Sequence, residues 1–116
     1  HSVVYDTAGH IFARFEAQKF GRDGGENADT AVSRALGCDL LILDDLGTEL
    51  MTSFVHSAMY QIVNTRLITG KKTVISTNLS PDEIGRRYGA PVLSRLQGEY
   101  QMLPFFGEDI RRQKRK

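Results

Sequence analysis

The stretch Leu40–Glu49, with the sequence LLILDDLGTE, decides both the fold class and the candidate site. Its four consecutive large aliphatic residues predict a strand buried on both faces, because a half-exposed strand would alternate apolar with polar residues. The run ends at Asp44 and Asp45, and a turn that contains a glycine follows. A carboxylate at the end of a buried strand needs a compensating partner, of which a metal ion is one. The second interpretation is a solvated strand end, where Asp45 and Glu49 cap turns.

The composition is typical of one soluble globular domain: 116 residues, 41% hydrophobic and 25% charged. No apolar run approaches the roughly 20 residues that cross a bilayer, so we expect no membrane association. The single cysteine, Cys38, excludes an internal disulfide and a cysteine-based zinc site, and it fits a cytoplasmic protein. Because His1, His10 and His56 form no cluster with carboxylates at metal-ligand spacing, we interpret them as structural or surface residues.

The net charge of +1 is unevenly distributed. The tail 111–116 holds five of the 15 basic residues and no acidic one, which leaves 10 basic against 14 acidic residues, or −4, in residues 1–110. Composition therefore does not indicate a strongly basic face for nucleic acid. The tail itself has two interpretations, contact with phosphates or a solvated terminus.

Periodicity and turn residues predict strands that alternate with helices along the chain. Ser80, Pro81 and Glu83 form the clearest helix start, an N-cap followed by a capping box. We expect strands at 2–5, 39–44, 72–78 and 100–106, and helices that follow residue 5 and cover 28–36, 52–69, 80–89 and 91–96. This order predicts an α/β fold with a mostly parallel sheet flanked by helices.

In such a sheet, ligands bind beyond the carboxyl ends of the strands, where Asp44, Asp45 and Asn78 fall. Two carboxylates and an amide suit a nucleoside triphosphate site, in which one acid holds Mg²⁺ through water and the other orients or deprotonates the attacking water. Asn78 has a second interpretation, a side chain that bonds its own turn. Arg95 and Arg111 are candidates for stabilising transferred phosphate, or else are surface charges.

Five blocks of sequence together resemble the ATPase domain of bacterial replicative-helicase loaders of the DnaC/DnaI type. These loaders are AAA+ proteins, related to the replication initiator DnaA and to the transposition helper IstB. The resemblance covers Ser2 to Arg111, and the blocks occur in the family's order. They are 40–49 (LLILDDLGTE), 64–67 (NTRL), 71–80 (KKTVISTNLS), 94–96 (SRL) and 106–111 (FGEDIR).

The resemblance implies a role for each matching residue. Asp44 and Asp45 match the Walker B pair, with Asp44 on Mg²⁺ and Asp45 as the catalytic acid. Asn78 matches sensor 1, which acts in both nucleotide binding and catalysis. Arg95 matches the arginine finger, which acts on ATP bound by the adjacent subunit. Arg111 matches the sensor 2 arginine, which contacts the phosphates in its own subunit.

The Walker A loop of the family, GxxxxGK[ST], has no match in the sequence. Gly70–Thr73 (GKKT) is the nearest imitation, but it runs from a helix to a strand and lacks the first glycine. We therefore interpret residues 1–110 as an AAA+ core truncated at its N-terminal strand and P-loop, which binds ATP weakly or not at all. The missing central strand predicts open sheet edges, closed by pairing across copies or by 100–106 moving next to 73–77.

The resemblance implies a domain that binds and hydrolyses ATP with Mg²⁺ in a primosomal helicase loader. The expected partners are the replicative helicase, single-stranded DNA, and further copies of the chain through the arginine finger. Two alternatives stay open. One is a transposition helper or phage replication ATPase of the IstB type, and the other is a non-catalytic interaction domain that has lost ATP use.

Overall fold

The computed structural model describes residues 1–21 and 26–101. Strands and helices alternate in the expected order, and most bounds lie within a few residues of the predicted ones. The strands are β1 (Val3–Thr7), β2 (Leu40–Leu46) and β3 (Lys72–Thr77). The helices are α1 (Ala8–Phe20), α2 (Glu26–Gly37), α3 (Ser53–Ile68), α4 (Pro81–Tyr88) and α5 (Ala90–Glu99).

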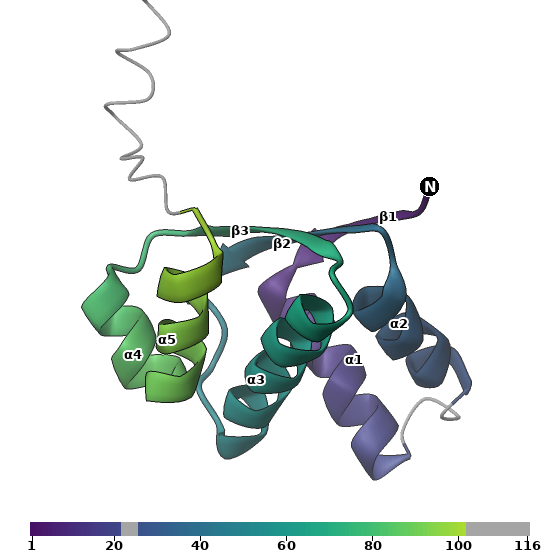
Figure 1. Cartoon of the computed structure of the whole chain (residues 1–116). Coiled ribbons are helices and arrows are strands. Elements are labelled where there is room, and N and C mark those ends of the chain that lie inside the picture. Colours follow the sequence, from purple (N-terminus) through teal and green to yellow (C-terminus); the bar gives the residue numbers. More distant parts are fainter. Residues whose placement is uncertain (22–25, 102–116) are drawn as a thin grey trace, which may run out of the picture.

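The described sheet has three parallel strands in the order β1-β2-β3 (Figure 1). Leu41 of β2 pairs with Val4 on one side and with Thr73 on the other. Each strand returns to the next through at least one helix, as parallel connections require. Thus the predicted α/β class and parallel sheet are confirmed.

The helices all lie on one side of this sheet, as Figure 1 shows. Leu41 and Leu43 point to that side and are fully buried, whereas Leu40 and Ile42 are only half-buried. The other face also carries Tyr5, which is 65% exposed. The prediction of a strand buried on both faces is therefore wrong for the described residues. The aliphatic run specifies a strand, but only helix packing decides how many of its faces are covered.

The start of α4 follows the sequence prediction closely. The Glu83 N–H donates to Ser80 Oγ, and Glu83 Oε1 accepts from the Ser80 N–H at 2.9 Å, which completes the capping box. Pro81 occupies the first turn, where its missing N–H leaves no hydrogen bond unmade. The predicted helix at 91–96 is longer, since α5 extends to Glu99.

The expected last strand at 100–106 is tested only at its start. Tyr100 and Gln101 lie in no strand, and residues 102–106 lie outside the described residues. Within the part of the chain that the structure describes, β3 pairs with β2 alone. The expected closure of the sheet beside β3 therefore stays a prediction.

Arg66 is the one fully buried charged side chain among the described residues, on the inner face of α3. Its Nη1 donates to the carbonyl oxygens of Ala35 (3.0 Å) and Leu36 (3.2 Å) at the end of α2. Nη2 donates to the Lys72 carbonyl at 2.6 Å, and Nε donates to Thr73 Oγ1 at 2.7 Å. One guanidinium thus joins α2, α3 and the start of β3, and it satisfies carbonyls that end a helix.

Candidate functional site

Asp44 lies near the carboxyl end of β2, and its side chain reaches across the uncovered face of the sheet. Oδ1 accepts a hydrogen bond from Ser76 Oγ on β3 at 2.9 Å, and Oδ2 accepts one from Tyr5 Oη on β1 at 3.2 Å. The Asp44 charge, together with this hydrogen bond, raises the pKa of the Tyr5 hydroxyl. All three strands therefore position this carboxylate.

Asp45 has a backbone conformation that few residues with a side chain adopt. Its φ is 61°, and it is the only non-glycine residue with positive φ in the described chain. The pairing of β2 with β3 shifts between Leu43 and Leu46, so β2 continues past the predicted end at Asp44 through a bulge. A bulge redirects side chains. It leaves the Asp45 carboxylate exposed, beside the inward-facing Leu46.

Asn78 follows the last residue of β3 and is exposed. Thr77, its neighbour, pairs with Leu46, so the acidic pair and Asn78 lie at the same end of the sheet. The side chain that bonds the turn is that of Thr77, whose Oγ1 accepts from the Leu79 N–H at 3.0 Å. Asn78 makes no side-chain hydrogen bond to a described residue.

Arg95 lies on α5 and is half-buried, with its guanidinium 5.8 Å from the ring centre of Tyr60 on α3. In the described chain it makes no ion pair with Asp44 or Asp45. A finger that acts on an adjacent subunit would not contact its own acidic pair, so its predicted role stays a prediction. Arg111, the predicted sensor 2 residue, lies outside the described residues.

The turn after β2 is fixed by Glu49, whose side chain is 5% exposed. Its carboxylate accepts from the Gly47 N–H at 2.9 Å, from Arg87 Nη2 at 3.3 Å and from the Tyr88 hydroxyl. Arg87 Nη2 also donates to the Glu49 carbonyl at 2.7 Å. The turn-capping interpretation is therefore confirmed for Glu49. Glu49 also contacts α4, and these contacts fix the turn beside the acidic pair. The local sequence does not predict them.

Hydrogen bonds stabilise the ionised form of the Glu49 carboxyl. Burial raises the pKa of the Glu49 carboxyl, but the hydrogen bonds from Tyr88, Gly47 and Arg87 outweigh it and hold that pKa below its ordinary value. Burial, and next the hydrogen bond to Glu49, raise the pKa of the Tyr88 hydroxyl. The ionised carboxylate is thus the form that the fold stabilises.

We expect Glu49→Gln to lower the free energy of unfolding by about 1–3 kcal/mol at pH 7, because charge-assisted hydrogen bonds are lost. A lowered pKa in the folded state stabilises the fold above the unfolded value near 4.5, and this contribution is lost as the pH falls through the folded pKa. Urea unfolding at pH 7 and pH 3 should show the gap between wild type and variant closing in acid. A gap of equal size at both values would contradict this account, and the exposed Glu99→Gln is the matched control.

The donor set at the strand ends fits a magnesium ion that is held largely through water. Asp44 and Asp45 supply carboxylate oxygens, the ligands that Mg²⁺ prefers. Within residues 1–21 and 26–101, no group of three or more His, Cys, Asp or Glu could enclose a metal ion. A site there would need oxygens from elsewhere, such as those of a bound phosphate.

The described residues contain no glycine-rich loop that leaves a strand and opens a helix. Gly70, with φ of 71°, lies between the end of α3 and the start of β3. This order confirms that Gly70–Thr73 is not a P-loop, since a phosphate-binding loop opens a helix. In the part of the chain described, no helix is long and apolar enough to span a bilayer.

The three-stranded parallel sheet, with its helices packed on one face, defines an α/β fold. Several solved structures share this fold, among them the following three. The first is the DnaC helicase loader, with 23% identity and a TM-score of 0.71, which covers 86% of this chain and 59% of that one. The second, a DNA replication initiation factor, has 22% identity, a TM-score of 0.64 and coverage of 83% and 28%. The third, AMPPCP-bound DnaA from Aquifex aeolicus, has 23% identity, a TM-score of 0.59 and coverage of 83% and 29%.

These similarities confirm the predicted resemblance at the level of the fold. The chain spans about three fifths of the DnaC structure and less than a third of the other two. No family model matches the sequence, and no curated protein matches it.

Proposed function

We propose that this chain is part of a domain that binds and hydrolyses ATP in a helicase loader for DNA replication. The observation that carries the proposal is the acidic pair at the bulge of β2, next to Asn78 at the end of β3. The strained backbone of Asp45 supports it, because such conformations cluster where function requires a particular side-chain direction. The likeness to the DnaC helicase loader supports the replication context.

In the proposed site, Asp44 would hold Mg²⁺ through water, and Tyr5 and Ser76 keep its carboxylate in place. When bound, the ion would neutralise charge on the phosphate oxygens. Asp45 would orient the attacking water and accept its proton, and the Asn78 amide would donate to that water or to the γ-phosphate. In a regular strand Asp45 would point to the helix-covered face, opposite to Asp44. The bulge keeps its carboxylate off that face, which Leu46 occupies instead.

Two arginines complete the proposal. Arg95 acts as an arginine finger on ATP bound by the adjacent subunit, so hydrolysis depends on self-association. Arg111 contacts the phosphates in its own subunit. The proposed partners are a replicative helicase and single-stranded DNA. The alternative function is that of a transposition helper of the IstB type. A pull-down assay separates the two, because a helicase loader would bind the replicative helicase and a transposition helper would bind a transposase.

A second candidate is a non-catalytic interaction domain. Both oxygens of Asp44 already accept hydrogen bonds within the described chain, so this carboxylate has a structural role without a metal ion. ATP hydrolysis separates the two candidates. The assay uses a protein that carries a phosphate-binding loop. ATP turnover that depends on Asp45 supports the ATPase, and absence of turnover supports the interaction domain.

We expect residues 1–116 alone to bind Mg·ATP with a dissociation constant above about 1 mM, because loop amides and the P-loop lysine supply most of the phosphate affinity. Calorimetric titration measures the dissociation constant of Mg·ATP for this chain. A longer protein that carries a phosphate-binding loop ahead of His1 is the comparison. Micromolar binding by residues 1–116 would contradict this expectation.

A further inference from the structure

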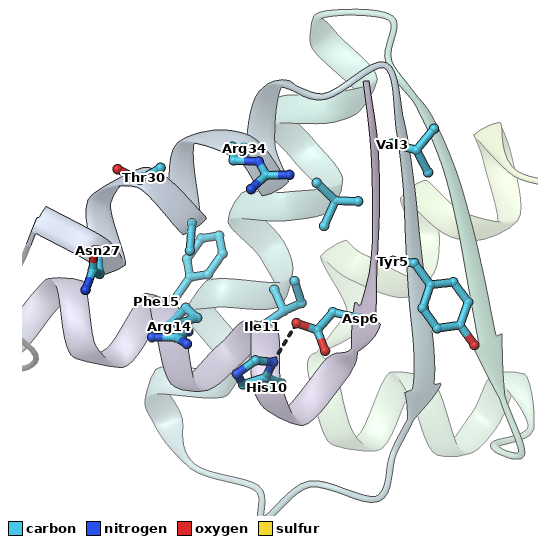
Figure 2. Close-up of a pocket in the computed structure, with 12 residues that line it drawn as sticks. Val3, Tyr5, Asp6, His10, Ile11, Arg14, Phe15, Asn27, Thr30 and Arg34 are labelled. Carbon is cyan, nitrogen blue, oxygen red and sulfur yellow. Dashed lines mark hydrogen bonds and ion pairs between the residues drawn. The ribbon is translucent and has the colours of Figure 1, made fainter. Parts of the chain in front are cut away.

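A cavity of about 530 Å³ lies along the outer edge of β1, between that strand and the helices α1 and α2. It shares Tyr5 with the site at the carboxyl ends of the strands but extends away from that site, toward α2. The apolar side chains of Ile11 and Phe15 form its floor, and Arg14 and Arg34 lie along its walls (Figure 2). Tyr5 lies on the far side of β1, where it faces the uncovered side of the sheet.

The backbone of β1 offers unused hydrogen-bonding groups along this cavity. The Leu40 N–H donates to the Ser2 carbonyl at 3.0 Å, and Val3 is the register partner of Leu40. In a parallel ladder this arrangement directs the N–H and C=O of Val3 and Tyr5 away from β2. Within the described residues, β1 pairs with no other strand. The backbone N–H of Thr7 also points away from β2, but it already donates to Asp6 Oδ1 at 2.8 Å.

The charges along the cavity are mainly positive. Arg34 is exposed and makes no ion pair with a described residue. Asp6, the one carboxylate among the described lining residues, is hydrogen-bonded to His10 Nδ1 at 2.5 Å, and Figure 2 shows this contact. Two arginines and one carboxylate, which is hydrogen-bonded to His10, therefore line the cavity, and Arg34 is the arginine that the proposal uses.

We propose that the outer edge of β1 binds an extended acidic peptide of a partner protein, which adds to the sheet as a further strand. Its backbone pairs with the outward groups of Val3 and Tyr5. Alternate side chains then lie on the two faces. Those on the helix side pass over Ile11 and Phe15 and place carboxylates near Arg34, and those on the other side pack beside Tyr5. A nucleic acid fits this edge less well, because it has no peptide backbone to pair with the outward N–H and C=O groups of Val3 and Tyr5.

The test uses the full chain and a fluorescein-labelled peptide of alternating glutamate and valine, about seven residues long, the usual length of a strand. Fluorescence anisotropy should show saturable binding. Arg34→Glu should weaken it about tenfold through charge reversal, whereas the exposed Arg86→Glu on α4 should change it less than about twofold. Val3→Pro should also weaken it about tenfold, because proline removes an outward N–H that β2 does not use.

The same peptide, N-methylated at alternate backbone amides, keeps its charge and loses strand pairing, so it should not bind. Circular dichroism checks that each variant is folded. Equal binding of the methylated and unmethylated peptides would overturn the proposal in favour of simple charge attraction. Absence of saturable binding to the wild-type chain would also overturn it. Tighter binding of an oligo-dT strand, sensitive to Arg34→Glu but not to Val3→Pro, would identify the edge as a nucleic-acid surface instead.

Discussion

Arg66→Leu is expected to lower the free energy of unfolding by about 3–5 kcal/mol, the largest stability effect of any single substitution considered. Leucine has no donor, so the carbonyls of Ala35, Leu36 and Lys72 lose the guanidinium, and only a weak contact from Cys38 Sγ remains on the Ala35 carbonyl. A buried acceptor that loses its partner carries its full desolvation penalty, about 1–3 kcal/mol each. Partial entry of water makes the sum smaller than three separate penalties.

Urea unfolding followed by circular dichroism measures this effect. Arg66→Lys is a second variant for the same measurement. It should also lower the free energy of unfolding, because an ammonium keeps the charge but cannot reproduce the planar arrangement of donors. Arg86→Leu, at an exposed position on α4, should change stability by less than about 0.5 kcal/mol. A change below about 1 kcal/mol for Arg66→Leu would show that these hydrogen bonds do not hold α2 and β3 together.

Local signals in the sequence predicted the local structure well. The capping box of Ser80 and Glu83 lies within four consecutive residues, so its geometry follows from the sequence alone. The strand at β2 followed from its aliphatic run, and the parallel sheet from the alternation of element types. The placement of Asp44, Asp45 and Asn78 at one end of the sheet then followed from topology.

Contacts between distant segments were not predictable in this way. Arg66 reads as an ordinary helical arginine, because its acceptors at Ala35 and Leu36 lie about 30 residues away in the sequence. Glu49 meets Tyr88 across 39 residues. The bulge at Asp45 depends on the pairing of Leu46 with Thr77, which no propensity encodes. The uncovered face of β2 likewise depends on where the helices pack.

Asp45→Asn, in a protein that carries a phosphate-binding loop ahead of His1, is expected to reduce the ATP hydrolysis rate by about 10²–10⁴-fold. The exposed carboxylate of Asp45 is the group proposed to accept the proton of the attacking water, and an amide cannot accept it. The substitution keeps the size of the side chain, and asparagine tolerates the positive φ of 61° as aspartate does. The fold and the affinity for Mg·ATP should therefore change little.

The central claim is that Asp44 and Asp45 are the acidic pair of an ATPase site. It is tested most directly in a protein that carries a phosphate-binding loop ahead of His1, by measuring Mg·ATP affinity and turnover together for wild type and Asp45→Asn. Asp82→Asn, at an exposed carboxylate in the first turn of α4, is the matched control. We predict Mg·ATP affinities within about threefold for all three proteins, and turnover lost only in Asp45→Asn. Turnover by Asp45→Asn equal to that of wild type would contradict the claim.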